Sequence, residues 1–139
     1  MGLHIAYQMK AGDFTAAGEA STGIKKQLRQ LGIPSAVLRR IAVAAYEAEL
    51  NLVIHSLGGE ITADVDAEKI VLRTVDCGPG IPDISLAMKE GYSTAGDEAR
   101  SLGFGAGMGL PNMKRNADEF DIVSVVPDGT TITMIFRIA

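Results

Sequence analysis

The sequence has little of three features that would assign it to a class of protein at once. It contains a single cysteine, so Cys77 has no partner for an internal disulfide. It contains no apolar run of membrane-spanning length. Its first residues also lack the charged start and apolar stretch of a signal peptide. We therefore expect a cytoplasmic protein.

An excess of positive charge is also missing. The net charge is −4 at pH 7, with an isoelectric point near 5.1, so the chain has no electrostatic footprint for nucleic acid or an anionic membrane. A protein or a small molecule is the expected partner. The 139 residues, 47% of them hydrophobic, suit a single domain over residues 1–139.

Helical and strand patterns alternate along the chain without repeats. Apolar residues at spacings of three and four predict helices, and Gly32 and Pro34 separate the first two of these. Shorter runs flanking turn residues predict strands and hairpins. The expected fold is a layer of helices against a largely antiparallel sheet. The expected helices cover residues 16–31, 34–57, 83–90 and 110–115, and the expected strands cover 3–9, 60–65, 69–75, 125–126 and 131–138.

The stretch from Cys77 to Gly109 stands apart from these patterns, because it holds eight of the sixteen glycines. A loop of this length in a compact domain is usually functional. Every second residue from Gly103 to Gly109 is glycine, directly before a predicted helix. Such a run serves as a flexible linker or structural turn, or it forms a phosphate nest at a helix N-terminus.

The long second helix carries a polar stripe, formed by Glu47, Asn51 and His55 at intervals of four residues. A solvated helix face would explain it. However, the surrounding residues are strongly apolar, and a buried amide needs a specific partner. A carboxylate and an amide oxygen one turn apart also suit Mg²⁺, and a glutamate can act as a general base.

Asp76 ends a predicted strand and begins the segment Asp76-Cys77-Gly78-Pro79-Gly80-Ile81. The segment reads as a glycine-proline turn in which the aspartate is a turn-former. Alternatively, Asp76 accepts a hydrogen bond from an exocyclic amino group while the glycines let a flat ring approach the backbone. Both adenine and guanine carry such a group.

Four groups of residues resemble, in order, the four boxes of the Bergerat-fold (histidine-kinase-like, GHKL) ATPases, over about residues 35–138. That family folds as a two-layer sandwich of helices on a mixed, largely antiparallel sheet. Within it, the chain is similar to the small anti-sigma-factor and stressosome-type serine/threonine protein kinases of bacterial partner switching. The groups are Glu47-x-x-x-Asn51-x-x-x-His55, Asp76-x-Gly78-x-Gly80-Ile81, Gly103-x-Gly105-x-Gly107-x-Gly109-Leu110 and Gly129-Thr130-Thr131.

The resemblance implies ATP or ADP as the nucleotide, together with Mg²⁺. Glu47 would be the general base, and Asn51 would hold Mg²⁺ between the phosphates. Asp76 would bind the adenine amino group, and Thr130 would support the base through a hydroxyl or a water. Residues 91–109 would form a lid. The other residues that it places at the nucleotide are Gly78, Gly80, Ile81, Gly103, Gly105, Gly107, Met108, Gly109 and Leu110.

The function that the resemblance implies is transfer of the ATP γ-phosphate to a serine or threonine of an antagonist protein of the STAS type. A sigma factor or a phosphatase would be the regulated partner, and a homodimer is compatible with it. The alternative is a nucleotide-dependent binding module without significant transfer. A detached histidine-kinase domain is a third, weaker reading, because neither His4 nor His55 heads a dimerisation helix.

One part of the family pattern is missing. Some relatives place an Arg or Lys immediately beside the last glycines, whereas the nearby cations here are Arg100, Lys114 and Arg115. We therefore expect slow transfer or help from a cation of the partner. His55 is read as a structural hydrogen-bonding residue, and Cys77 as a small buried hydrophobe.

Overall fold

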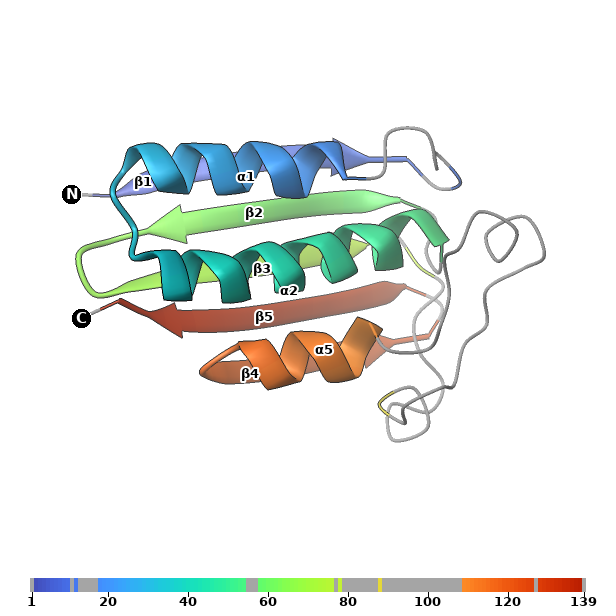
Figure 1. The fold of residues 1–139 in the computed structure, drawn as a ribbon. Helices are drawn as coiled ribbons and strands as arrows, with labels where there is room; N and C mark the ends of the chain where they lie inside the picture. The colour runs from blue at the N-terminus through green and yellow to red at the C-terminus, as the bar shows by residue number, and fades with distance from the viewer. Residues whose placement is uncertain are drawn as a thin grey trace.

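The computed structural model describes residues 2–10, 12, 18–54, 58–76, 78, 88, 109–126 and 128–138. Within these ranges, three helices cover one face of a five-stranded sheet (Figure 1). This arrangement confirms the predicted α+β class. The helices are α1 (Glu19–Gln30), α2 (Ser35–Ile54) and α5 (Gly109–Asn116), and the strands are β1 (Leu3–Met9), β2 (Gly59–Val65), β3 (Lys69–Asp76), β4 (Glu119–Val125) and β5 (Gly129–Arg137).

The sheet has the strand order β1-β2-β3-β5-β4. Every strand pair in the described part is antiparallel, so the mixed character expected of the sheet is absent there. Because β3 pairs with β5 and not with β4, the end of β3 lies beside the start of β5, with Val75 opposite Thr131. This crossover brings two segments together that are about fifty residues apart in sequence.

The boundaries between elements follow from local chemistry. Gly32, with a φ of 80°, ends α1, because its N–H binds Arg29 O at 3.0 Å while Ile33 N–H binds Leu28 O at 3.3 Å. In the β2–β3 hairpin, Asp66 Oδ1 accepts the N–H groups of Glu68 and Lys69 at 2.8 and 2.9 Å. Both predicted boundaries are confirmed.

Strand β4 is longer than the sequence patterns predicted. The expected strand covered only residues 125–126, whereas β4 begins at Glu119 and pairs with β5 from Glu119 opposite Ile135 to Val125 opposite Gly129. Its charged residues Glu119 and Asp121 point to the exposed face, while Phe120 and Ile122 pack toward the core. An edge strand needs apolar residues on one face only, so its pattern is weak.

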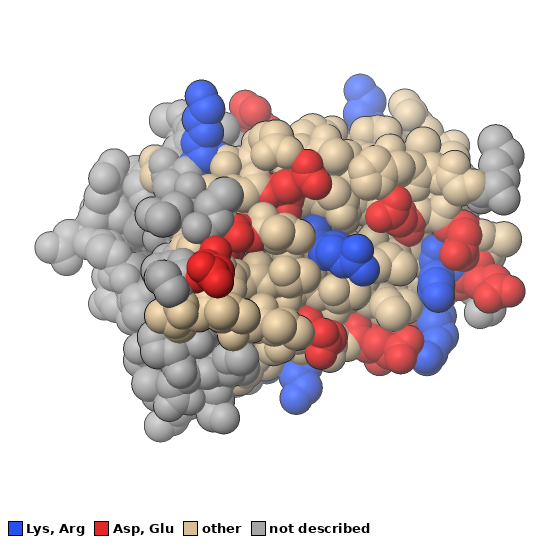
Figure 2. All heavy atoms as spheres, turned by 180° about the vertical axis from the view of Figure 1, so that it is seen from behind, with Lys and Arg blue, Asp and Glu red and all other residues tan. Residues whose placement is uncertain are grey.

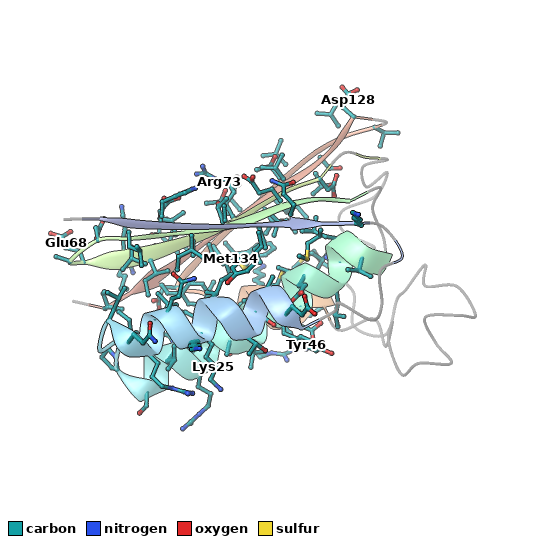
Figure 3. The ribbon with its side chains drawn as sticks, turned by 90° about the horizontal axis from the view of Figure 1, so that it is seen from above. Lys25, Tyr46, Glu68, Arg73, Asp128 and Met134 are labelled. Carbon is teal, nitrogen blue, oxygen red and sulfur yellow. The ribbon has the colours of Figure 1, made fainter. Side chains whose placement is uncertain are left out.

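The core lies between the sheet and the helices. In β5, Ile132, Met134 and Phe136 alternate toward the helices and are almost completely buried. Figure 3 shows Met134 between the two layers and Arg73 on the opposite side of the sheet. Helix α2 is the central helix and packs against both α1 and α5. Its buried face includes Leu38, Ile41, Ala44, Ala45, Ala48 and Leu52.

The core also contains one carboxylate that sequence reasoning did not single out. Glu49, on α2, is fully buried. Its two carboxyl oxygens accept the N–H groups of Ala20 at 3.1 Å and Ser21 at 3.0 Å, in the first turn of α1. It therefore caps α1 from a neighbouring helix, where the helix dipole favours a negative charge.

Within the described ranges, no helix is both long and apolar enough to cross a bilayer. Several sequence predictions fall outside these ranges. They are the helix at 83–90 apart from Met88, the lid at 91–109 apart from Gly109, His55 and Cys77, and the predicted nucleotide residues Gly80, Ile81, Gly103, Gly105, Gly107 and Met108.

Candidate active site

The start of α5 lies against the polar stripe of α2. Glu47 and Asn51 lie one turn apart near the end of α2, as the spacing predicts. A methyl group added to Gly109 would lie 3.2 Å from Glu47 Oε2 and 3.3 Å from Asn51 Oδ1. The two side-chain oxygens therefore converge on the first residue of α5, where only a glycine leaves them undisturbed.

The environment of Glu47 suits a base. Its side chain is half-buried, and this burial raises the pKa of the Glu47 carboxyl above its ordinary value. A side-chain hydrogen bond from Asn112 opposes this shift and lowers the pKa. A raised pKa makes the carboxylate a stronger proton acceptor. It also brings the pKa of the group closer to neutral pH, where a general base works best.

Asn112 is a residue of this site that sequence reasoning missed. Its Oδ1 accepts a hydrogen bond from Arg115 Nη1 at 3.0 Å. Because a guanidinium group only donates, this contact assigns the amide oxygen to Arg115 and leaves the amide NH₂ to donate to Glu47. The available signal was the spacing, since Asn112 follows Gly109 by three residues and shares one face of α5 with it.

A second carboxylate is held at the end of β3. Asp76 Oδ1 accepts the N–H of Thr130 at 2.8 Å and the N–H of Gly78 at 3.0 Å. These hydrogen bonds use one oxygen, and in the described part of the chain Oδ2 is left to accept a bond from a ligand. Gly129 makes this approach possible, because its φ is 138° and a methyl group there would lie 2.6 Å from Asp76 Oδ1.

The predicted support of the base by Thr130, through a hydroxyl or a water, stays a prediction, and the structure gives this residue two contacts. The side chain is buried, and its Oγ1 lies 2.9 Å from Ser124 Oγ on the neighbouring strand. Its main-chain N–H is the group that reaches Asp76. Thr130 therefore orients the carboxylate, and Ser124, which carried no sequence signal, orients Thr130.

The two carboxylate clusters lie at the same end of the molecule. Figure 1 shows the last turn of α2, the first turn of α5, the end of β3 and the start of β5 together at its right-hand side. Of the predicted site residues, the structure brings Glu47, Asn51 and Gly109 into one cluster and Asp76, Gly78 and Thr130 into the other. Leu110 is buried in the core, so only its main chain remains available to a ligand.

The residues present fit a nucleotide with a divalent cation. Asn51 Oδ1 and Glu47 Oε2 are hard oxygen donors, of the kind that Mg²⁺ accepts together with phosphate oxygens and water. The N-terminus of α5 adds the partial positive charge of the helix dipole, which favours phosphate. Asp76, anchored through one oxygen, presents an acceptor for an amino group.

Comparisons with known proteins agree with this geometry. Residues 12–136 match the family model of the histidine kinase-like ATPase domain. The chain belongs to this family. It is 35% identical over 127 residues to the serine/threonine-protein kinase RsbT of Bacillus subtilis, an overlap of 88% of this chain and 87% of that protein. It is 33% identical over 99 residues to an anti-sigma F factor of Thermoanaerobacter sp., an overlap of 68% of this chain and 66% of that protein.

Solved structures of the histidine kinase-like family have the same fold. The RsbU and RsbW domains of Rv1364c from Mycobacterium tuberculosis match with a TM-score of 0.64 at 19% identity, over 99% of this chain and 32% of that one. The mycobacterial sensor histidine kinase MprB matches with a TM-score of 0.54 at 17% identity, over 97% of each chain. The family resemblance noted in the sequence is thus confirmed, and the family's ATPase fold is the fold of this chain.

Proposed function

We propose that this chain is an ATP-dependent protein serine/threonine kinase of a bacterial partner-switching module. The observation that carries the proposal is the convergence of Glu47 and Asn51 on Gly109 at the start of α5. A site that only binds nucleotide does not need a half-buried carboxylate with a raised pKa beside the phosphate position. The names of two relatives, a serine/threonine-protein kinase and an anti-sigma F factor, support a role in this type of regulation.

Each cluster has a separate task in the proposed reaction. When bound, Mg·ATP supplies the phosphoryl group, and its metal ion supplies positive charge that offsets the negative charge of the phosphate oxygens. Glu47 accepts the proton of the attacking serine or threonine hydroxyl, whose oxygen forms the new bond to phosphorus as ADP leaves. Asn51 Oδ1 would hold Mg²⁺, the α5 N-terminus would hold phosphate, and Asp76 would fix the base through its amino group.

The proposed protein substrate is a STAS-type antagonist, with a sigma factor or a phosphatase as the regulated partner. The two kinds of relative support such a pair of partners, because one is named a kinase and the other an anti-sigma factor. The single-domain organisation of residues 1–139 and a cytoplasmic location remain predictions.

A transfer assay with radiolabelled ATP and the product of the adjacent gene tests the proposal. We expect labelled serine or threonine on that protein, and we expect Glu47→Gln to lower the rate by about 10²-fold or more while Mg·ATP still binds. Glu19→Gln, an exposed glutamate on α1, is the matched control and should transfer normally. Normal transfer by Glu47→Gln would refute the base assignment.

A nucleotide-dependent binding module is the second candidate, and one observation favours it. The cations of α5, Lys114 and Arg115, lie in its last turn, and Arg115 contacts Asn112. The first turn of α5 itself therefore carries no positive side chain, whereas some relatives have one beside the last glycines. If the wild-type chain binds Mg·ATP and its partner without labelling it, this second function replaces the first.

A further inference from the structure

The open face of the sheet carries an apolar patch that the nucleotide site does not use. Val75, Val123 and Val125 are between 48% and 56% exposed. They are among the large hydrophobic side chains that are exposed in the described part of the chain. We call these three residues the valine patch. Contiguous exposed apolar surface of this kind commonly marks a site of interaction.

The strand register shows that the patch is continuous. Val75 on β3 and Val123 on β4 both lie opposite Thr131 on β5, so the three residues form one row across the sheet. Val125 follows Val123 on the same face, two residues along β4. Within the described residues, strand β4 is also the outer strand of the sheet, so the patch lies at a sheet edge.

The surroundings of the patch are mainly acidic, although Arg73 lies on the same face, two residues before Val75. Glu60 lies opposite Val75 on the neighbouring strand, Asp121 precedes Val123 on the same face of β4, and Asp128 lies in the β4–β5 hairpin. Figure 2 looks onto this face, where Asp and Glu are more prominent than Lys and Arg. The described sheet residues 2–10, 58–76 and 118–138 carry nine Asp and Glu against four Lys and Arg, whereas residues 19–54 and 109–116 of the helix layer carry three against seven.

The patch lies directly behind the cluster that holds Asp76. Neighbouring residues of a strand point to opposite faces, so Val75 is exposed while Asp76 turns toward the site. In the same way, Thr131 lies on the open face while Thr130 donates its N–H to Asp76. Ser124, between Val123 and Val125, contacts Thr130. A partner bound to the open face would therefore contact the same strands that position Asp76 on the opposite face.

We propose that the valine patch is the docking surface of a protein partner whose contact surface is apolar at its centre and surrounded by Lys and Arg. The acidic surroundings oppose nucleic acid and anionic lipid, and two copies of the patch would bring like charges together. Docking is coupled to nucleotide binding through the strand positions shared with Asp76. The coupling rests on the proposed function, whereas the docking itself does not.

Photo-crosslinking in the native host tests which molecule covers the patch. A photoreactive phenylalanine analogue replaces Val123, and the matched control carries it at Val43, an exposed valine on the helix layer. We expect position 123 to crosslink to one protein through a peptide rich in Lys and Arg around apolar residues, and position 43 not to do so. Absence of a product, a crosslink to a second copy of this chain, or an acidic peptide would each overturn the proposal.

The partner that crosslinking identifies is then purified, and its affinity for variants of this chain tests whether apolar and acidic side chains of the patch bind it. Val123→Asp should weaken its binding by about tenfold or more, and Val43→Asp should have little effect. Asp121→Lys should also weaken binding, with a smaller salt dependence, and it gives a second reading if Val123→Asp does not fold. Unchanged affinity in a folded Val123→Asp variant, or equal loss with Val43→Asp, would overturn the docking site.

Calorimetry with ADP then tests the coupling. The partner should change ADP affinity, and ADP should change partner affinity by the same factor. Equal ADP affinities with and without the partner would overturn the coupling alone. The transfer assay with the STAS-type substrate, run on the wild-type chain and on Val123→Asp, separates the docking result from the proposed function. If the wild-type chain does not transfer phosphate, the proposed function fails, but the docking data still stand.

Discussion

The two carboxylates of the site are held in different ways. Asp76 is fixed by main-chain N–H groups of Thr130 and Gly78, at the junction of two sheet strands. Glu47 lies on a helix and is held by the Asn112 side chain, in an environment that raises its pKa. Main-chain groups cannot rotate away, whereas the Asn112 amide depends on a further contact with Arg115. The sheet cluster is thus built for rigid recognition, and the helix cluster for an adjustable proton affinity.

Alanine substitution of the two glycines that face the carboxylates should give the largest difference between the clusters in stability and transfer rate. In Gly129→Ala, the added methyl group meets the carbonyl and carboxylate of Asp76 at a φ of 138°, so we expect a loss of about 3 kcal/mol of stability. In Gly109→Ala, the methyl group meets two movable side chains, so stability should fall by less than about 1 kcal/mol while transfer falls about 10²-fold. Urea unfolding and the transfer assay measure both. Equal stability losses would show that the clusters do not differ in rigidity.

Substitution of Asp76 separates anchoring from recognition. Asp76→Ala leaves the N–H groups of Thr130 and Gly78 without their acceptor and should cost about 1–3 kcal/mol. Asp76→Asn keeps one amide oxygen for those donors, so it should unfold nearly as the wild type does but bind ADP more weakly. Calorimetric titration with ADP measures the second effect. Wild-type ADP affinity in Asp76→Asn would count against the adenine assignment.

Removal of the Asn112 side chain tests the adjustable carboxylate. Its hydrogen bond lowers the pKa of Glu47, so Asn112→Ala should raise that pKa and move the acidic limb of the transfer profile to higher pH. Lys114→Ala, an exposed residue on the same helix, is the control. A loss of rate without any shift of the profile would assign Asn112 a structural role only.

The smallest expected effect is a gain in stability. Because burial raises the pKa of folded Glu47 above its unfolded value, folding favours the protonated form. The stability that this carboxyl contributes is complete below the unfolded pKa and is lost as the pH rises through the folded pKa. Glu47→Gln does not titrate, so it should be slightly more stable than the wild type at neutral pH and equally stable in acid. Thermal unfolding at several pH values measures the difference, and a constant difference would contradict it.

Local patterns predicted most of the framework because they depend on neighbouring residues. The apolar stripe of α2, the glycine that ends α1 and the Asp66 turn are each read from a few consecutive positions. Strand β4 was underestimated because its charged residues occupy the exposed face of an edge. Asn112 and Ser124 were missed because their roles depend on a neighbour brought close by the fold.

The sequence by itself determined the class of fold, the stripe of Glu47 and Asn51, and the resemblance to the histidine kinase-like ATPases, because spacing and residue type are properties of the chain. Only the tertiary structure decided that Gly109 faces that stripe, that Asp76 is anchored by Thr130, and that the valine patch is continuous. These contacts join residues dozens of positions apart. They exist only once helix packing and strand order have brought those residues together.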